Sequence, residues 1–345
     1  MPEAKIGVIG GSGLYHIKGL TDIAEVDIET PFGRPSDSIT TGHLEGAAVA
    51  FLPRHGKGHH LSPGEVPYRA NIYALKSLGV EWIISVNAAG SLKEEFKPGE
   101  LVIPDQLIDR TRNRASSFFS GGIVAHIIFA EPFCPVLSQL LYRTAKEAGV
   151  AVHRGGTYLA MEGPAFSTRA ESNLYRSWGG DIIGMTASPE AKLAREAEIC
   201  YAAIVSITDY DCWQKHDEPT PIDVIIETLK QNNDRIREII RITAARIPDE
   251  RRCDCATALK TAIVTDPASI PPESQRAGST PYPCTEAPMS KSIGASLLAL
   301  LLLAGCDANT FFPPATEPVA QPNAPPATSA PADGTIRIAS YNIQV

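Results

Sequence analysis

The sequence predicts an α/β fold in which a mostly parallel mixed sheet is flanked by helices. Short apolar runs typical of strands alternate with amphipathic helical stretches as far as residue 246. Several of these runs are apolar at every position, which is typical of strands buried on both faces of a parallel sheet. The loops with functional character follow strands, so we expect a binding site along the edge where the strands end.

Composition and charge are those of a soluble globular enzyme. The chain has 345 residues, of which 43% are hydrophobic and 20% charged, which suffices for one large domain or two. The formal net charge of −8 argues against a nucleic-acid-binding protein, which would carry a basic surface. An anionic substrate must therefore be held by a local group of positive side chains. Because MPEAKIGVIGG enters a strand without a signal peptide, we expect a cytoplasmic protein.

The first strand, Lys5–Ile9, leads into a glycine-rich turn at residues 10–14. Such a turn can direct several backbone N–H groups at one anion, so it is a candidate phosphate site. It is not a dinucleotide-binding fingerprint, since His16 stands where the third glycine would be. It is not a P-loop either, because no Gly-Lys-Ser/Thr follows.

The strand Ala47–Leu52 runs into the loop 53–60, which contains one Arg, one Lys and three His residues. This is the concentrated positive site of an acidic chain, and the Arg54 fork can bind two oxygens of an oxyanion at once. The alternative is a flexible basic loop. A metal site formed by His55 and His59 ranks lower, because the loop contains no carboxylate or Cys.

Two further strand–helix pairs follow. The segment Tyr68–Leu78 is expected to form a helix that ends at Gly79, and the strand Trp82–Val86 leads to the small residues 87–91, which permit close approach of a ligand to the backbone. Pro135–Ala148 is an amphipathic helix with Pro at its first position and Gly just after its end. Short strand pieces are expected between these pairs, at Leu101–Ile103 and Gln106–Ile108.

Two strands in the next part of the chain also end in loops of functional character. Thr157–Met161 leads into Glu-Gly-Pro, after which Ser167 or Thr168 can cap a helix that reaches about residue 178. After the strand Asp181–Gly184, Ser188 as N-cap and the following Pro predict another helix start. The free N–H groups of that helix would favour an anion beside Thr186.

The central strand of the sheet is predicted within residues 202–213. An apolar, β-branched run there ends in Asp209-Tyr210-Asp211. If the extended conformation continues, the carboxylates of Asp209 and Asp211 point the same way. Two neighbouring carboxylates resist ionising together, so one can keep a proton near neutral pH and act as a general acid. The alternative is a solvated turn that ends the strand.

The cysteines do not predict a metal site or a disulfide framework. The chain has seven of them, scattered and without a CxxC pair, and Cys253-x-Cys255 is the only close pair. That pair is either a redox-labile dithiol or incidental. The preceding segment Ile222–Arg246 carries an apolar face and predicts a long helix, which Pro248 stops.

The C-terminal part differs in composition from the rest of the chain. Met-Ser-Lys, a short apolar run and Leu-Ala-Gly-Cys306 together are typical of a secretory signal and resemble the lipobox of bacterial lipoproteins. We interpret this as a junction between two neighbouring genes, the alternative being an apolar segment that packs as a helix. The last eleven residues resemble the opening strand of the endonuclease/exonuclease/phosphatase family. The predicted organisation is one α/β domain at 1–266, a linker at 267–288, a lipoprotein-signal-like segment at 289–306 and a disordered Pro/Ala-rich tail at 307–345.

Many ordered segments of the chain resemble the 5′-methylthioadenosine phosphorylase family, within the purine nucleoside phosphorylase superfamily. The likeness covers residues 5–213 and continues weakly to about Asp266. It implies a purine nucleoside phosphorylase-like fold and a role in methionine and purine salvage. The matching segments are IGVIGGSGL, TPFGRPSD, the Arg54-His55-Gly56 loop, NAAGSL, LIDRT, AEPFCP, MEGPAFSTRAES, IIGMT and TDYDCW.

The resemblance implies phosphorolysis: inorganic phosphate attacks C1′ of methylthioadenosine, and adenine leaves. Phosphate is then a co-substrate, no cofactor is needed, and no nucleic acid is bound. By the resemblance, the protein is a homotrimer, and it would meet a membrane only if 289–306 were processed. The phosphate ligands implied are Ser12, Arg54, His55, Asn87, Ala88 and Thr186. The nucleoside ligands implied are Met185 at the ribose, Phe166 along the base, His126 (from an adjoining subunit), Ile222 and Ile225 at the 5′-methylthio group, and Ser167 and Tyr210 as further substrate-binding residues.

Asp209 and Asp211 match the family's base-binding positions. The departing adenine needs a proton at N7, which a carboxylic acid can supply, and a carboxylate can accept from the exocyclic amino group. Relatives that prefer 6-oxopurines carry Asn here, so the acidic pair favours adenine nucleosides. Three alternatives stay open: a phosphorylase for 6-oxopurine nucleosides or methylthioinosine, an exported lipoprotein in which only the tail matters, and a nucleotide-binding module without chemistry.

Overall fold

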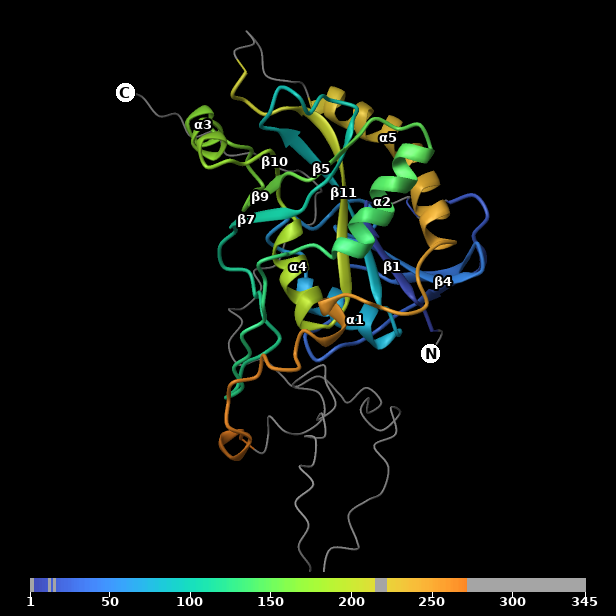
Figure 1. The fold of residues 1–345 in the computed structure, drawn as a ribbon, viewed down its shortest axis with the longest axis vertical. Coiled ribbons are helices and arrows are strands. Elements are labelled where there is room, and N and C mark those ends of the chain that lie inside the picture. Colours follow the sequence, from blue (N-terminus) through green and yellow to red (C-terminus); the bar gives the residue numbers. More distant parts are fainter. Residues whose placement is uncertain (1–2, 12–13, 15–16, 215–221, 272–345) are drawn as a thin grey trace, which may run out of the picture. The chain divides into compact units, whose positions relative to one another are not determined.

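A computed structural model describes residues 3–11, 14, 17–214 and 222–271, which all belong to one compact unit. The described strands form a single sheet, and six of its ten strand pairs are parallel. The predicted fold class, a mostly parallel mixed sheet flanked by helices, is therefore confirmed (Figure 1). The strands are β1 (Ile6–Gly10), β2 (Thr21–Val26), β3 (Ile39–Leu44), β4 (Ala47–Pro53), β5 (Trp82–Ser91), β6 (Leu101–Ile103), β7 (Gln106–Arg110), β8 (Val152–Arg154), β9 (Thr157–Met161), β10 (Ile182–Gly184) and β11 (Cys200–Tyr210).

The centre of the sheet is formed by β5 and β11, which run parallel to each other. β5 also pairs with β1 in parallel and with β10 in antiparallel orientation. Successive residues of β11 belong to the two opposite faces of the sheet: Ala203 and Val205 pack in one core cluster, Ala202 and Ile204 in the other. The continuous apolar run therefore marks a strand that is buried on both faces, as predicted.

Helices cover both of these faces. α1 and α4 contribute to the first core cluster, with Ile72 and Leu193 among their buried residues, and α2 and α5 to the second, with Leu141 and Ile239. α2 and α5 contact each other and lie side by side in Figure 1. The helices are α1 (Tyr68–Ser77), α2 (Pro135–Glu147), α3 (Arg169–Ser177), α4 (Ala187–Glu196) and α5 (Ile222–Ala244), with 3₁₀ turns η1 (Asp254–Thr257) and η2 (Pro267–Ser269).

Local signals in the sequence correctly predicted several helix ends. Thr168 caps α3 with a full capping box to Glu171. Ser188 keeps an extended conformation (φ −110°, ψ 134°), so the regular part of α4 begins at Pro189 as predicted. β5, in contrast, is longer than expected: it continues through residues 87–91, which we predicted as a loop.

The predicted C-terminal segments lie almost entirely outside the described residues. Of the linker 267–288, only the first residues are described, and η2 lies there. The signal-like segment 289–306 and the tail 307–345 are not described, so these assignments stay predictions. Within the described ranges, none of the helices combines the length and the apolar composition needed to cross a bilayer.

Candidate active site

The candidate site lies where β1 and β4 end, beside the middle of the longer strand β5. The Arg54 backbone N–H, just after β4, donates to the carbonyl of Gly10 at the end of β1 (2.8 Å). In-register pairing brings Ile9 of β1 beside Ser85 of β5. Parallel pairing thus brings the glycine-rich turn, the basic loop and the polar end of β5 together, as the order of motifs predicted. Ser12 of that turn falls outside the described residues.

Arg54 is buried and held in place by its own partners. Its guanidinium forms a two-point ion pair with the buried carboxylate of Glu190, with Nη2 to Oε2 at 3.0 Å. Nη2 also donates to Ser85 Oγ (2.7 Å) and Nη1 to the carbonyl of Val86 (2.8 Å). Burial alone would lower the pKa of Arg54, but the adjacent Glu190 charge raises it above its usual value. Arg54 is therefore a permanently charged, oriented group, and its Nη1 carries a second hydrogen besides the one donated to Val86.

Asn87 and Thr186 extend this network toward α4. Asn87 Nδ2 donates to Thr186 Oγ1 (2.9 Å), and Asn87 Oδ1 lies 3.0 Å from Ser85 Oγ. Both residues are buried. Because Thr186 accepts through its oxygen, its hydroxyl hydrogen points away from Asn87. Arg54, Asn87 and Thr186 thus present N–H and O–H donors at one place, which suits a tetrahedral oxyanion.

His55 is neutral at physiological pH. Its Nδ1 lies 2.8 Å from the carbonyl oxygen of Leu61, which can only accept, so Nδ1 carries the proton and Nε2 is an acceptor. Burial, and secondarily the charge of Arg54, lowers the pKa of His55 to about 4. A neutral imidazole beside an anion site can accept a hydrogen bond from a protonated phosphate oxygen.

This pKa leads to a prediction about stability. The folded-state pKa of His55 lies below its ordinary value of 6.5. The contribution of neutral His55 to the free energy of unfolding is therefore complete above pH 6.5 and is lost as the pH falls toward 4. Because His55 is partly exposed to solvent, which weakens the effect, we expect the free energy of unfolding to fall by about 1–2 kcal/mol. Urea unfolding at pH 7 and pH 4.5 measures it, with His55→Asn as the comparison. An equal pH dependence in both proteins would contradict the assignment.

The carboxylates of Asp209 and Asp211 stand at the end of β11. A bulge at Thr208 interrupts the register with β5, and such bulges re-aim side chains next to binding sites. Asp209 Oδ1 accepts from the Thr208 hydroxyl (2.7 Å). The pKa of each aspartate is raised, in both cases mainly by burial, and for Asp209 the neighbouring Asp211 adds to the effect. Each carboxyl therefore holds a proton to higher pH than a free aspartate.

Gly90 of β5 faces both carboxylates. A Cβ added there would lie 3.6 Å from Asp209 Oδ2 and 3.4 Å from the Cβ of Asp211. Gly90 is three residues beyond Asn87 on the same strand, a separation of about 10 Å in extended chain. The donor cluster around Asn87 and the acidic pair beside Gly90 therefore lie at two separate points along β5.

A Gly90→Ala variant tests this spacing. The added methyl meets its neighbours only at ordinary contact distances of 3.4–3.6 Å, so the fold is expected to persist. The methyl would occupy space beside the carboxylates, so the KM for the nucleoside is expected to rise about tenfold or more, a cost of roughly 1–3 kcal/mol, as for one methylene in a tight pocket. The KM for phosphate is expected to stay within twofold. If the KM for phosphate rose as much as the KM for the nucleoside, the two substrates would not bind at separate places.

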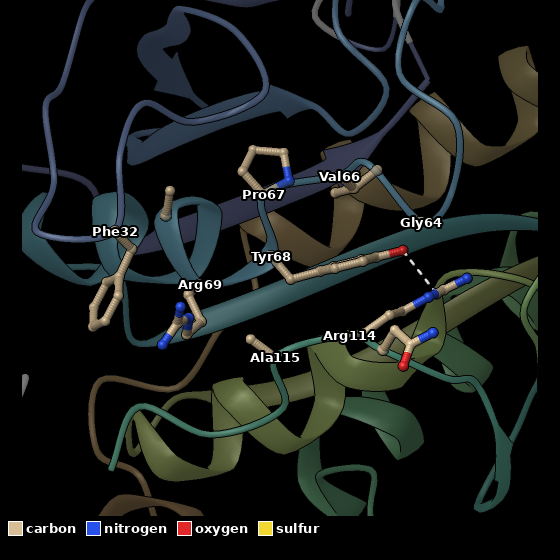
Figure 2. Close-up of a pocket in the computed structure, with 10 residues that line it drawn as sticks. Phe32, Gly64, Val66, Pro67, Tyr68, Arg69, Arg114 and Ala115 are labelled. Atoms are coloured by element: carbon tan, nitrogen blue, oxygen red, sulfur yellow. Dashed lines mark hydrogen bonds between the residues drawn. The ribbon is translucent and has the colours of Figure 1, made fainter. Parts of the chain in front are cut away.

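Arg114 positions the backbone at Met185. Its Nη1 donates to the Met185 carbonyl (2.6 Å) and to the Tyr68 hydroxyl (3.0 Å), and its Nη2 to the carbonyl of Glu162. The Met185 thioether lies against Gly163, where a Cβ would be 2.5 Å from Sδ. Figure 2 shows Arg114 reaching the Tyr68 hydroxyl at the wall of a neighbouring cavity of about 160 Å³. Among the predicted ligand residues that the structure describes, none lines that cavity.

The structure places the remaining predicted residues in different surroundings. Phe166 is 64% exposed on the loop after β9. The Tyr210 hydroxyl donates to the Glu94 carbonyl and its ring packs against Trp213, so this side chain has partners of its own. His126 is exposed. Ser167, Ala88 and Ile225 are half-buried or exposed, and the side chain of Ile222 is not described.

Sequence analysis missed the residues that orient the predicted ligands. Glu190 stands in the first turn of α4, and nothing in the sequence distinguishes an acidic residue at a helix start from a buried partner of Arg54. Ser85 and Tyr201, whose hydroxyls lie 2.9 Å and 3.0 Å from Glu190 Oε2, looked like ordinary strand residues. Arg114 lies in a loop without a motif.

Comparisons with known proteins show the family to which the chain belongs. The model of the Phosphorylase superfamily matches residues 5–245. An S-methyl-5′-thioadenosine phosphorylase of Geobacter sulfurreducens is 60% identical over 274 residues, which cover 79% of this chain and 96% of that protein. An S-methyl-5′-thioadenosine phosphorylase of Koribacter versatilis is 52% identical, and the match covers 78% of this chain and 92% of that protein.

Solved structures give the same result. A methylthioadenosine phosphorylase sourced from an antarctic soil metagenomic library has a TM-score of 0.78 and 49% identity, covering 82% of this chain and all of that one. Another similar structure is a variant adenosine/methylthioadenosine phosphorylase from Schistosoma mansoni, solved in complex with methylthioadenosine. It has a TM-score of 0.70 and 36% identity, and the match covers 75% of this chain and 96% of that one. This chain therefore belongs to the methylthioadenosine phosphorylases of the phosphorylase superfamily.

Proposed function

We propose that the chain catalyses the phosphorolysis of 5′-methylthioadenosine to adenine and 5-methylthioribose 1-phosphate. A phosphate oxygen forms a bond to C1′ while the bond from C1′ to N9 breaks, and its electron pair leaves with the purine. The observation that carries the proposal is the pairing of a buried donor cluster at Arg54 and Asn87 with an acidic pair at the end of β11, which lies beside Gly90, three residues beyond Asn87 on β5. Relatives of more than 50% identity with this activity in their names support it.

Phosphate would be held by the donors of Arg54, Asn87 and Thr186, with the backbone at Ala88 and the turn at Ser12 as further ligands. The fixed ion pair with Glu190 keeps Arg54 in one orientation before phosphate arrives. Holding the nucleophile below C1′ converts a bimolecular attack into an effectively unimolecular one, which can lower the barrier by about 7 kcal/mol or more. Phosphate is therefore a co-substrate.

The base would be held by Asp209 and Asp211. A purine leaves as a poor anion, so a protonated carboxyl at N7 lowers the barrier, and the raised pKa of both groups favours that protonated form. A second carboxylate can accept from the 6-amino group of adenine, whereas a 6-oxo group would oppose it with lone pairs. Ser167 and Tyr210 would flank this end, and the exposed side chain of Phe166 would lie along the bound base.

The ribose and its thioether would lie between these two ends. Met185, held through its carbonyl by Arg114, would pack against the ribose. We propose that His126, Ile222 and Ile225 line the 5′-methylthio pocket and that His126 reaches the site of an adjoining subunit in a homotrimer. Exposed apolar residues near His126 support a subunit contact there: Val124, Ile128, Ile263 and Val264 are 47%, 76%, 44% and 58% exposed.

Substrate comparison tests the proposal against its alternatives. Base release from methylthioadenosine and methylthioinosine is measured with and without phosphate, and light scattering gives the oligomeric state. We expect phosphate-dependent release that favours the adenine compound, from a trimer. Preference for the inosine compound would overturn the role of the acidic pair. Binding of both nucleosides without turnover would favour a binding module.

A further inference from the structure

Four cysteines that are far apart in the sequence come together at the beginning of β11. Cys134 immediately precedes α2, and Cys200 is the first residue of β11. Cys253 is the N-cap of η1, and Cys255 lies within η1. Their four sulfur atoms all lie within 4.8 Å of one another. The sulfur of Cys253 lies 3.3 Å from that of Cys200 and 3.6 Å from that of Cys134.

These spacings suit one metal ion better than disulfides. In a tetrahedral thiolate site with zinc–sulfur bonds of about 2.3 Å, neighbouring sulfurs are about 3.8 Å apart. A disulfide would bring two sulfurs to about 2.05 Å, and the four cysteines are free thiols here. Three of the four side chains are fully buried, and Cys253 is half-buried. Four soft sulfur donors converge on one point, with a route from solvent on the Cys253 side.

We propose that Cys134, Cys200, Cys253 and Cys255 bind one thiophilic divalent cation of the zinc class as a tetrathiolate. Four protein ligands complete the coordination of such an ion, so the site is structural and has no open position for catalysis. Cys200 and Asp209 stand at opposite ends of β11, nine residues apart, or about 30 Å in extended chain. The site is thus independent of the phosphorolysis site.

The ion would fasten the segment that follows α5 to the core. That segment already contacts the body of the protein: Arg251 donates to the carbonyl of Glu198, and the Leu259 N–H donates to the Glu198 carboxylate (3.0 Å). It also supports the loop around His126, whose N–H donates to the carbonyl of Ala262 (2.8 Å). Because the ion binds the folded chain, it is expected to raise the free energy of unfolding.

The test uses the full chain, with any affinity tag removed, reduced and stripped with a chelator. Cobalt(II) serves as a spectroscopic probe, and zinc content is measured by mass spectrometry. We expect one ion per chain, a thiolate-to-cobalt charge-transfer band with tetrahedral visible bands, and a higher Tm with zinc. The same measurements are made with Cys284 and Cys306 replaced by Ser, so that these cysteines cannot supply ligands.

Cys253→Ser is the informative variant because this half-buried side chain can be changed with little effect on packing. Metal affinity is expected to fall at least about tenfold and the zinc-dependent rise in Tm to disappear. Cys212→Ser is the matched control, since the Cys212 sulfur instead faces the Ser167 carbonyl (3.2 Å), and it is expected to retain one ion. Failure of the reduced wild-type chain to bind cobalt or zinc would overturn the proposal, as would unchanged affinity in Cys253→Ser.

Discussion

A double variant, Asp209→Asn with Asp211→Asn, is expected to lower kcat/KM for methylthioadenosine by about 10²–10⁴-fold. An amide cannot deliver a proton to N7 of the departing purine, whereas a carboxyl whose pKa is raised by burial can. Phosphate binding is expected to persist, because the donors around Arg54 are untouched. Steady-state adenine release measures the first effect, and calorimetric titration with phosphate measures the second.

The pH profile distinguishes acid catalysis from a merely structural role of the pair. In the wild-type enzyme, kcat/KM is expected to fall as the pH rises through the raised pKa of the proton donor, since only its protonated form is active. This limb is expected to be absent from the residual activity of the double variant. Asp249→Asn, which removes an exposed carboxylate paired with Lys5, is the control and should keep full activity. Unchanged turnover in the double variant would refute the mechanism.

Glu190→Gln is expected to lower the free energy of unfolding by about 3–5 kcal/mol, because it leaves the buried charge of Arg54 without its partner. The guanidinium also loses its fixed orientation, so the KM for phosphate is expected to rise. Urea unfolding and phosphate-dependent kinetics measure the two effects. Since bound phosphate supplies a compensating anion, saturating phosphate is expected to recover part of the lost stability.

Glu29→Gln is the matched control for this prediction. Glu29 also pairs with an arginine, Arg34, at 2.7 Å, but both side chains are exposed. Loss of such a surface pair typically costs no more than about 1 kcal/mol. Similar losses of stability in both variants would mean that burial does not govern the Arg54 pair, and that the network around Glu190 is not what orients Arg54.

The fold was predictable wherever apolar runs and helix-end signals were strong. The run within β11 predicted a strand buried on both faces, and Ser188 with the following Pro predicted the regular start of α4. The end of β5 was not predicted as strand, because Asn87 and the small residues after it are typical of loops. They form a strand because β11 and β10 supply backbone partners on either side, which is a tertiary effect.

The sequence allowed candidate ligand residues of the site to be predicted, but not the hydrogen bonds and ion pairs that hold them in place. Arg54, Asn87 and Thr186 were expected from strand-end motifs and the family resemblance, and the structure brings them together. Glu190 and Ser85 orient them from positions more than one hundred residues apart in the chain, a relation that no local pattern encodes. The four clustered cysteines were not predicted for the same reason: the sequence contains no CxxC pair, and three separate segments supply these sulfurs.

The most direct test of the central claim follows the sugar product in the full-length enzyme. Methylthioadenosine is incubated with the enzyme in the presence and absence of orthophosphate, and ³¹P NMR monitors the phosphorus while absorbance monitors adenine. The account predicts that adenine and a sugar 1-phosphate ester form in equal amounts, and that neither forms without phosphate. Adenine released at the same rate without phosphate, with free methylthioribose as the product, would contradict it.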